Sequence, residues 1–205
     1  MSQIDPNHKL ENNNAGNEAE PLLTAAASNR PIWLVELLDW IKTFVLAFAV
    51  VLLLHFFVFN LSKVEGHSME PTLTEHEWLF VNKIIYIVGK PKVGDVVILK
   101  EPGSGIGEKK FLVKRIVGLP GDRIEVHDQH LYRNGKLVDE PYTDSLIEDM
   151  SYGPEVINEG HYFVMGDNRH ARASLDSRSF HAVPEKLIRG RAEFILWPYK
   201  EIRAL

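Results

Sequence analysis

The stretch FLVKRIVGL, residues 111–119, predicts a β-strand whose successive side chains point to opposite faces. On one of these faces, Lys114 lies between Leu112 and Ile116. Burial among apolar neighbours disfavours the charged form of an amine and lowers its pKa. The pattern therefore predicts a strand that holds Lys114 as a candidate general base.

An unperturbed lysine is a poor base, because with a pKa near 10.4 only about a few in ten thousand are neutral at pH 7. Lowering the pKa by about three units makes the neutral amine common, at a cost of about 4 kcal/mol. The alternative is that Lys114 extends to solvent or pairs with a carboxylate such as Asp122. The strand pattern by itself leaves both interpretations open.

Further short β patterns surround this strand, and they decide the fold class. Apolar and β-branched runs punctuated by Gly, Pro and Asn occupy residues 78–88, 94–100, 109–119, 122–132, 161–165 and 191–197. The Asn134-Gly135 pair between HLYR and KLV predicts a type I′ hairpin. Since this part of the sequence shows no long amphipathic helix, we expect a mainly β protein with an antiparallel, barrel-like domain.

Composition argues against several classes of function. The 205 residues carry a net charge of −5 without a dense Lys/Arg block, so nucleic acid is not expected as a partner. The absence of cysteine excludes disulfides, thiolate nucleophiles and Cys-ligated zinc. His127 and His130 flank a predicted turn without a third ligand, and the glycines of residues 103–107 fit a hairpin loop better than a phosphate loop. We therefore expect no metal and no cofactor.

The N-terminal part of the chain has a different pattern. Residues 1–31 are polar and too poor in large apolar side chains to repay the entropy of folding, so we expect a disordered tail. Residues 43–59 carry no formal charge and, with the next two residues, are long enough to cross a hydrocarbon layer of about 30 Å as a helix. One transmembrane helix is therefore predicted.

Residues 32–42 place Trp33 and Trp40 just before this run, as is typical of a segment at a membrane interface. A cleaved secretory signal is disfavoured by the long upstream segment and the missing cleavage motif, and a buried core helix by the uniformly apolar composition. The sequence thus predicts an interfacial turn plus one transmembrane helix over residues 32–61 and a β domain over residues 62–205.

Two further polar clusters accompany the Lys114 strand at predicted strand edges: VEGHSMEPTL at residues 64–73 and GDNRHARASLDSR at residues 166–178. Ser68 in the first cluster is a candidate nucleophile, although a serine before a turn proline is ordinary. His67 is its neighbour, but adjacent residues of an extended segment point to opposite faces, so a Ser-His pair is not expected.

Taken together, the clusters resemble the bacterial type I signal peptidases, which are membrane-bound serine proteases that remove signal peptides. The resemblance covers residues 64–198 in the family's order: GHSMEPTL, KRIVGLPGD, GDNR, SLDSR, VP and GRA. It implies a single-pass protein of the bacterial cell membrane, with preprotein signal peptides as substrates and the lipid bilayer as a partner. Arg30 and Lys42 precede the helix and only Lys63 follows closely, so we expect a cytoplasmic N-terminus and an extracytoplasmic catalytic domain.

The resemblance also implies a role for each matched residue. Ser68 matches the nucleophile and Lys114 the general base of a Ser-Lys dyad. The matched supporting residues are Ser174, which orients the lysine, the charged pair Asp176 and Arg178, and a turn beside the site of Gly166, Asp167, Asn168 and Arg169. The residues expected to form the oxyanion hole or to bind substrate are Gly66, Met69, Pro71, Leu112 and Val113, although Met69 also fits core packing and Pro71 a turn.

The sequence departs from the family pattern at two places. Gly66 stands where some members have a serine that contributes to the oxyanion hole, so the backbone N–H of Ser68 needs help from another backbone group or water. The GDNRHARASLDSR cluster has four residues between its two motifs, where the common pattern has two. We expect this longer loop to bring Arg172 near the site, where a cation lowers the Lys114 pKa further.

In the family, an extended substrate pairs with the strands beside both dyad residues, here near residues 61–68 and 111–114, and small pockets accept alanine-like residues at positions −1 and −3. Residues 78–88 fit either a lipid-facing surface or an ordinary core strand. Two rival interpretations are a self-cleaving repressor of the DNA-damage response, which lacks a membrane anchor, and a non-catalytic, membrane-tethered β module that binds extended peptides.

Overall fold

The computed structural model describes residues 31–103, 105 and 110–205. Almost all of the tail expected over residues 1–31, and most of the glycine-rich loop at residues 103–107, lie outside the described residues.

Helix α1 (Ile32–Phe57) is 26 residues long and spans about 39 Å at 1.5 Å per residue. It continues through the segment expected as an interfacial turn, because residues 32–42 contain no Gly or Pro to interrupt it, and Lys42 pairs with Asp39 at 3.0 Å along the helix. It ends at Phe57 instead of residue 61, because residues 59–63 pair as a strand. Among the described residues, α1 is the one helix long and apolar enough to cross a membrane.

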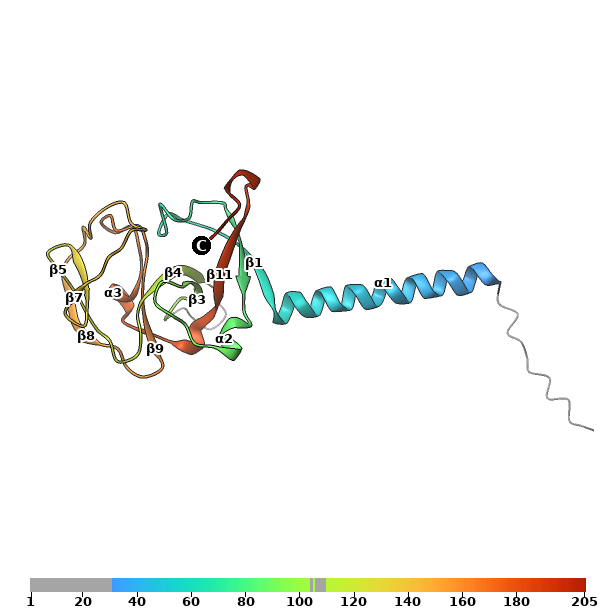
Figure 1. Cartoon of the computed structure of the whole chain (residues 1–205), viewed down its shortest axis with the longest axis horizontal. Helices are drawn as coiled ribbons and strands as arrows, with labels where there is room; N and C mark the ends of the chain where they lie inside the picture. The colour runs from blue at the N-terminus through green and yellow to red at the C-terminus, as the bar shows by residue number, and fades with distance from the viewer. Residues whose placement is uncertain (1–30, 104, 106–109) are drawn as a thin grey trace, which may run out of the picture. The chain divides into compact units, whose positions relative to one another are not determined.

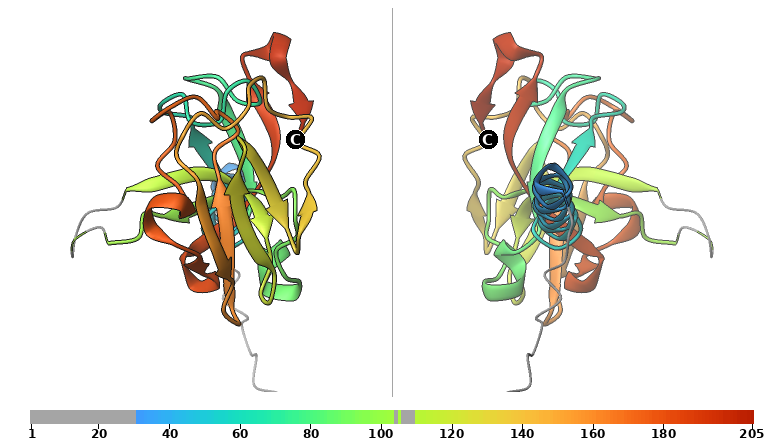
Figure 2. Two further views of the ribbon diagram at one scale, coloured as in Figure 1. Left: turned by 90° about the vertical axis from the view of Figure 1, so that its left-hand side faces the viewer. Right: turned by 90° about the vertical axis from the view of Figure 1, so that its right-hand side faces the viewer.

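The larger of two sheets is antiparallel throughout and contains eight strands. Figure 1 shows β3, β4 and β11 at its centre, and Figure 2 shows the strands from two further sides. In spatial order the strands are β1 (Phe59–Lys63), β2 (Trp78–Asn82), β11 (Ile188–Trp197), β3 (Val96–Lys100), β4 (Phe111–Gly118), β9 (His161–Met165) and β10 (Val183–Pro184), with β12 (Arg203–Ala204) paired to β11. This arrangement confirms the prediction of a mainly antiparallel β protein.

The smaller sheet has four strands, in the order β7 (Lys136–Leu137), β6 (His130–Arg133), β5 (Arg123–His127) and β8 (Tyr152–Val156). Figure 1 shows β5, β7 and β8 together at one end of the β domain. The predicted hairpin is confirmed, because Asn134 and Gly135 have positive φ angles of 55° and 75° between β6 and β7.

Short helices complete the described part of the chain: α2 (Ile85–Val88), α3 (Ser177–Phe180), and the 3₁₀ turns η1 (Glu185–Leu187) and η2 (Tyr199–Glu201). The run at residues 78–88, expected as one strand, is divided between β2 and α2. The division follows from Asn82, whose Oδ1 accepts hydrogen bonds from the backbone N–H groups of Ile84 and Ile85 and so starts a turn. The β2 part is an ordinary core strand with Leu79 and Val81 buried.

The core covers both faces of β4 from Lys114 onward, because residues 114–118 are all buried. Val113 packs against the apolar cluster that contains Val64 and Met69, whereas Leu112 packs against a different cluster that contains Ile116. Because the nucleophile loop supplies Val64 and Met69 to the first cluster, packing of the core brings that loop against β4.

Candidate active site

Ser68 lies in the loop between β1 and β2. The chain turns at Gly66, whose φ of +85° lies in the left-handed region that residues with side chains rarely adopt. The Gly66 N–H donates a hydrogen bond to Glu75 Oε1 at 3.3 Å, and Leu73 is fully buried farther along the loop. Ser68 is thereby held half-buried between a polar turn and the core.

Lys114 meets Ser68 from β4. Its Nζ lies 2.6 Å from Ser68 Oγ and 2.9 Å from the carbonyl oxygen of Val113, and the residue is only 1% exposed. Lys114 therefore does not extend to solvent. Nor does it pair with Asp122, which instead accepts a hydrogen bond from the Leu119 N–H. The arrangement leaves a buried amine within reach of a hydroxyl group.

Burial lowers the pKa of Lys114 from its usual 10.5 to about 8. The carboxylates of Asp176 and Asp167 raise the pKa and the guanidinium of Arg178 lowers it, but burial has the largest effect. The cation that acts on Lys114 is therefore Arg178. Arg172, expected in that place from the sequence, has an exposed side chain.

The turn at residues 166–169 follows β9 and packs against the nucleophile loop. Asn168 donates from its backbone N–H to the Ser68 carbonyl oxygen at 3.1 Å, and from Nδ2 to the preceding carbonyl oxygen at 3.0 Å. Gly166 allows this close approach, because a Cβ there would collide with Ser174 Oγ and with the Ser68 carbonyl oxygen. The turn at residues 166–169 therefore holds the backbone of Ser68 in place.

Asp176 and Arg178 form a bidentate ion pair, with Nε to Oδ1 and Nη2 to Oδ2 both at 2.9 Å. Asp176 is fully buried, accepts a hydrogen bond from the Gly166 N–H at 3.2 Å and caps the N-terminus of α3. Burial acts to raise the pKa of Asp176, but the hydrogen bond and charge of Arg178 outweigh it, so the pKa is lowered overall. The charged carboxylate ties the loop before α3 to the turn beside Ser68.

Ser174 is buried next to Gly166. Its hydroxyl contributes to the lowered pKa of Asp176 but makes no hydrogen bond of normal geometry with any described residue. The two hydrogen bonds of Lys114 Nζ go to Ser68 Oγ and to the Val113 carbonyl oxygen, and not to Ser174. An orienting role for Ser174 therefore stays a prediction.

A cleft of about 560 Å³ opens beside the dyad, lined mainly by residues 61–66 and 110–114. Among the described strands, β1 pairs with β2 alone, and residues 111–114 pair with β3 alone, because pairing with β9 begins at Arg115. Both segments thus offer a strand edge to an extended peptide. Of the residues expected to bind substrate, Gly66, Met69, Leu112 and Val113 line the cleft, whereas Pro71 is exposed and does not.

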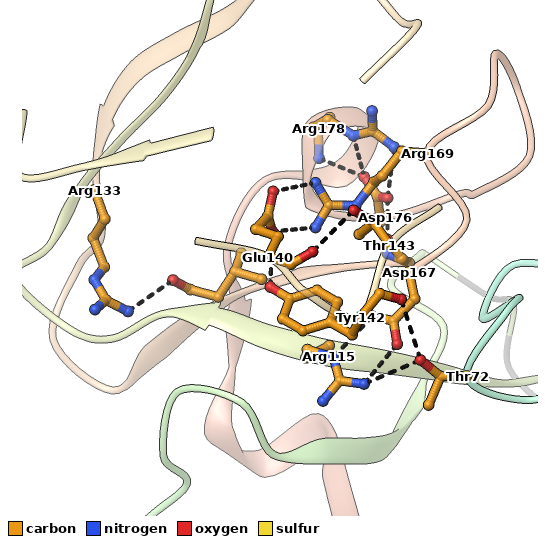
Figure 3. A network of polar contacts seen from close by, with 12 residues as sticks. Thr72, Arg115, Arg133, Glu140, Tyr142, Thr143, Asp167, Arg169, Asp176 and Arg178 are labelled. Carbon is orange, nitrogen blue, oxygen red and sulfur yellow. Dashed lines mark hydrogen bonds and ion pairs between the residues drawn. The ribbon is translucent and has the colours of Figure 1, made fainter. Parts of the chain in front are cut away.

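Sequence reasoning missed three residues of the surrounding polar network, which Figure 3 shows. Arg115 Nη2 pairs with Asp167 Oδ2 at 2.6 Å, Glu140 pairs with Arg169, and the Tyr142 ring lies under the Arg115 guanidinium. A second charged residue inside an apolar strand was a usable signal for Arg115. Glu140 and Tyr142 come from a segment without periodicity, and their contacts exist only in three dimensions.

Comparison with known proteins agrees with the motifs. The family model described as signal peptidase, peptidase S26, matches residues 37–197. The chain is 40% identical over 178 residues to a signal peptidase I of Bacillus licheniformis, covering 82% of this chain and 92% of that protein. It is 39% identical over 181 residues to signal peptidase I S of Bacillus subtilis, covering 82% and 93%. A solved signal peptidase I from Enterococcus faecalis is 30% identical, with a TM-score of 0.42 over 51% of this chain and 97% of that one. The chain belongs to the peptidase S26 family of signal peptidases.

Proposed function

We propose that this protein is a membrane-anchored serine endopeptidase that removes N-terminal signal peptides from exported preproteins, with Ser68 and Lys114 as its catalytic dyad. Membership of the signal peptidase family supports the activity and the substrate class. The observation that carries the mechanism is the 2.6 Å separation between Ser68 Oγ and the Nζ of a buried lysine with a lowered pKa.

In the proposed reaction, neutral Lys114 takes the Ser68 hydroxyl proton while Oγ forms a bond to the scissile carbonyl carbon. The protonated amine then gives this proton to the leaving nitrogen as the carbon–nitrogen bond breaks, which releases the mature protein. Water attacks the remaining ester with Lys114 again as the base, and Ser68 recovers its proton as the signal peptide leaves.

The oxyanion of the tetrahedral intermediate needs preorganised donors. We assign the backbone N–H of Ser68 as one donor. Gly66 has no hydroxyl to offer, and its own N–H is directed to Glu75, so the second donor is a water or a substrate-induced backbone group. Gly66 instead contributes the left-handed turn that presents Ser68 to the cleft.

Two strand edges explain how an extended signal peptide reaches the dyad. Residues 61–66 and 111–114 line the cleft together; β1 pairs with β2 alone among the described strands, and residues 111–114 of β4 pair with β3 alone. A peptide lying between them gains backbone hydrogen bonds from both sides, and Met69, Leu112 and Val113 offer apolar contacts to small residues at positions −1 and −3.

Anchoring by α1 supplies the remaining part of the proposal. The helix crosses the bilayer once, the residues before it are cytoplasmic, and the β domain from residue 62 onward is extracytoplasmic. The length and apolar composition of α1 support this assignment, as do Arg30 before the helix and Lys42 in its N-terminal half. An anchored enzyme meets anchored substrates at a high effective concentration.

The test is cleavage of a purified preprotein by the detergent-solubilised full chain, compared with Ser68→Ala and Lys114→Ala. We expect wild type to release the mature protein and both variants to lose cleavage. A fully active Lys114→Ala variant would remove the dyad mechanism. A folded wild type that binds the preprotein without cleaving it would establish the non-catalytic binding module instead.

A further inference from the structure

Arg169 is a buried cation, only 1% exposed and among the largest fully buried side chains of the described residues. A buried guanidinium requires both a counter-charge and acceptors for its N–H groups. Nε donates to the Gly166 carbonyl oxygen at 2.7 Å, and the two Nη atoms donate to the two carboxylate oxygens of Glu140. The Glu140 side chain is only 11% exposed itself, so this bidentate pair lies largely outside solvent.

The segment that supplies Glu140 also supplies Tyr142, which is connected through Arg115 to Asp167, the second charged residue of the turn. The Tyr142 hydroxyl donates to Glu140 Oε1 at 2.8 Å, and the Tyr142 ring lies 4.2 Å from the guanidinium carbon of Arg115. Arg115 in turn binds both carboxylate oxygens of Asp167. Glu140 therefore binds Arg169 directly, whereas Tyr142 is connected to Asp167 only through Arg115, and Figure 3 shows these residues together.

This turn is also the part of the chain that fixes the backbone of the nucleophile. Asn168, which lies between the two charged residues, donates its backbone N–H to the Ser68 carbonyl oxygen at 3.1 Å. A continuous series of contacts thus runs from Glu140 through Arg169 to Asn168 and Ser68. Glu140 itself is not among the residues that line the cleft.

We propose that Glu140 is a positioning residue for Ser68, acting through its ion pair with Arg169 on the turn that holds the Ser68 carbonyl. The inference rests on the proposed function and deepens it, because the geometry at stake is the contact between Ser68 Oγ and Lys114 Nζ. Displacement of a reacting group by about 1 Å can cost about 100-fold in rate. A carboxylate remote from the substrate therefore controls how well the nucleophile faces its base.

The direct test is Glu140→Gln in the detergent-solubilised full chain, with kcat expressed per active site titrated by a serine-acylating probe. This substitution leaves the Arg169 charge without its partner and should lower kcat by about tenfold. KM for the preprotein should stay within about twofold, because Glu140 does not line the cleft. The pH of half-maximal activity should be unchanged, because Glu140 is not among the groups with the main effects on Lys114.

Glu148→Gln is the matched control, because Glu148 comes from the same connection between β7 and β8 but binds the exposed His170 and the N–H of Ala171. It should change kcat by less than about twofold. Tyr142→Phe provides a milder variant in case Glu140→Gln does not fold, since it removes only the hydroxyl that donates to Glu140. It should lower kcat per titrated site in the same direction, by a smaller factor.

A double-mutant cycle separates positioning from general weakening of the fold. Asn168→Ala removes the side-chain hydrogen bond from the turn to the carbonyl oxygen of His67, next to Ser68. If Glu140 acts through the turn, the kcat losses of Glu140→Gln and Asn168→Ala should combine to less than their product. Losses that multiply, or a folded Glu140→Gln variant with full kcat, would overturn the proposal. If wild type cleaves and Ser68→Ala does not, such a result refutes the role of Glu140 alone, whereas a wild type without cleavage overturns the function and this role together.

Discussion

Replacing Lys114 with methionine should stabilise the protein at neutral pH while abolishing catalysis. The substitution keeps an unbranched side chain of similar length in a site that is 1% exposed, and it removes the ionisable amine. The gain follows from the lowered pKa of Lys114 in the folded protein. At any pH at which the unfolded chain keeps this amine protonated, the low pKa in the folded state reduces the free energy of unfolding of wild type. Methionine removes this cost.

The size of the effect follows from the pKa of about 8 in the folded protein and the usual 10.5. Below pH 8 both states are protonated, and the buried lysine costs the folded state about 3 kcal/mol. Between pH 8 and pH 10.5 the folded amine is neutral and the cost falls, to about 2 kcal/mol at pH 9 and about 1 kcal/mol at pH 10. Methionine also loses the contacts with Ser68 and Val113, which offsets the gain by about 1–3 kcal/mol without dependence on pH.

The measurement is the thermal unfolding midpoint of Lys114→Met and wild type in the same detergent from pH 7 to pH 10. Over this range, the difference in free energy of unfolding between Lys114→Met and wild type should change by about 2.5 kcal/mol, which corresponds to about 5–10 °C in the unfolding midpoint for a domain of this size. The stability of the variant relative to wild type should therefore fall by that amount as the pH rises. Lys136→Met, at an exposed lysine of β7, is the matched control for loss of one cation. A difference between Lys114→Met and wild type that stays constant across the range would refute the reasoning.

Two further substitutions test the supporting loop. Gly166→Ala places a Cβ against Ser174 Oγ and the Ser68 carbonyl oxygen. It should cost about 1–3 kcal/mol of stability, measured by unfolding, and lower kcat for preprotein cleavage at least about tenfold. A variant that is both stable and active would contradict the packing at Gly166. Asp176→Asn removes the fully buried one of the two carboxylates that pair with Arg178 and leaves only Asp149, so it should cost about 3 kcal/mol at neutral pH. Because the pKa of Asp176 is lowered, this contribution is present at neutral pH and is lost as the pH falls through that pKa, so the cost measured by unfolding should shrink in acid and not grow.

Local patterns were sufficient to predict several parts of the fold and site. The strand pattern predicted β4 and made Lys114 a candidate base, but it left open whether the amine is buried, which the packing on both faces of β4 decides. Asn134-Gly135 predicted its hairpin from the φ angles that the turn requires. The separate motifs around Ser68, Lys114 and residues 166–178 could be assigned to one site only through the family resemblance, because no local rule brings distant segments together.

The parts that sequence reasoning missed depend on contacts between distant segments. The apolar run predicted to continue as helix to residue 61 changes to strand at Phe59, because these residues pair with β2, and hydropathy alone does not distinguish the two states. Arg178 acts on Lys114 in place of Arg172, because the bidentate contact with Asp176 draws its side chain inward. Glu140 gave no local signal, because its importance comes from a partner 29 residues away.

The pH dependence of kcat/KM for preprotein cleavage tests the central claim most directly, since it reports the protonation of the free enzyme. If neutral Lys114 is the base, activity should rise about tenfold per pH unit below pH 8 and level off above it, following the pKa of about 8. The sign is fixed by chemistry, because only the unprotonated amine can accept the Ser68 proton. A profile that is flat from pH 6 to pH 9, or one that keeps rising beyond pH 10, would contradict the account.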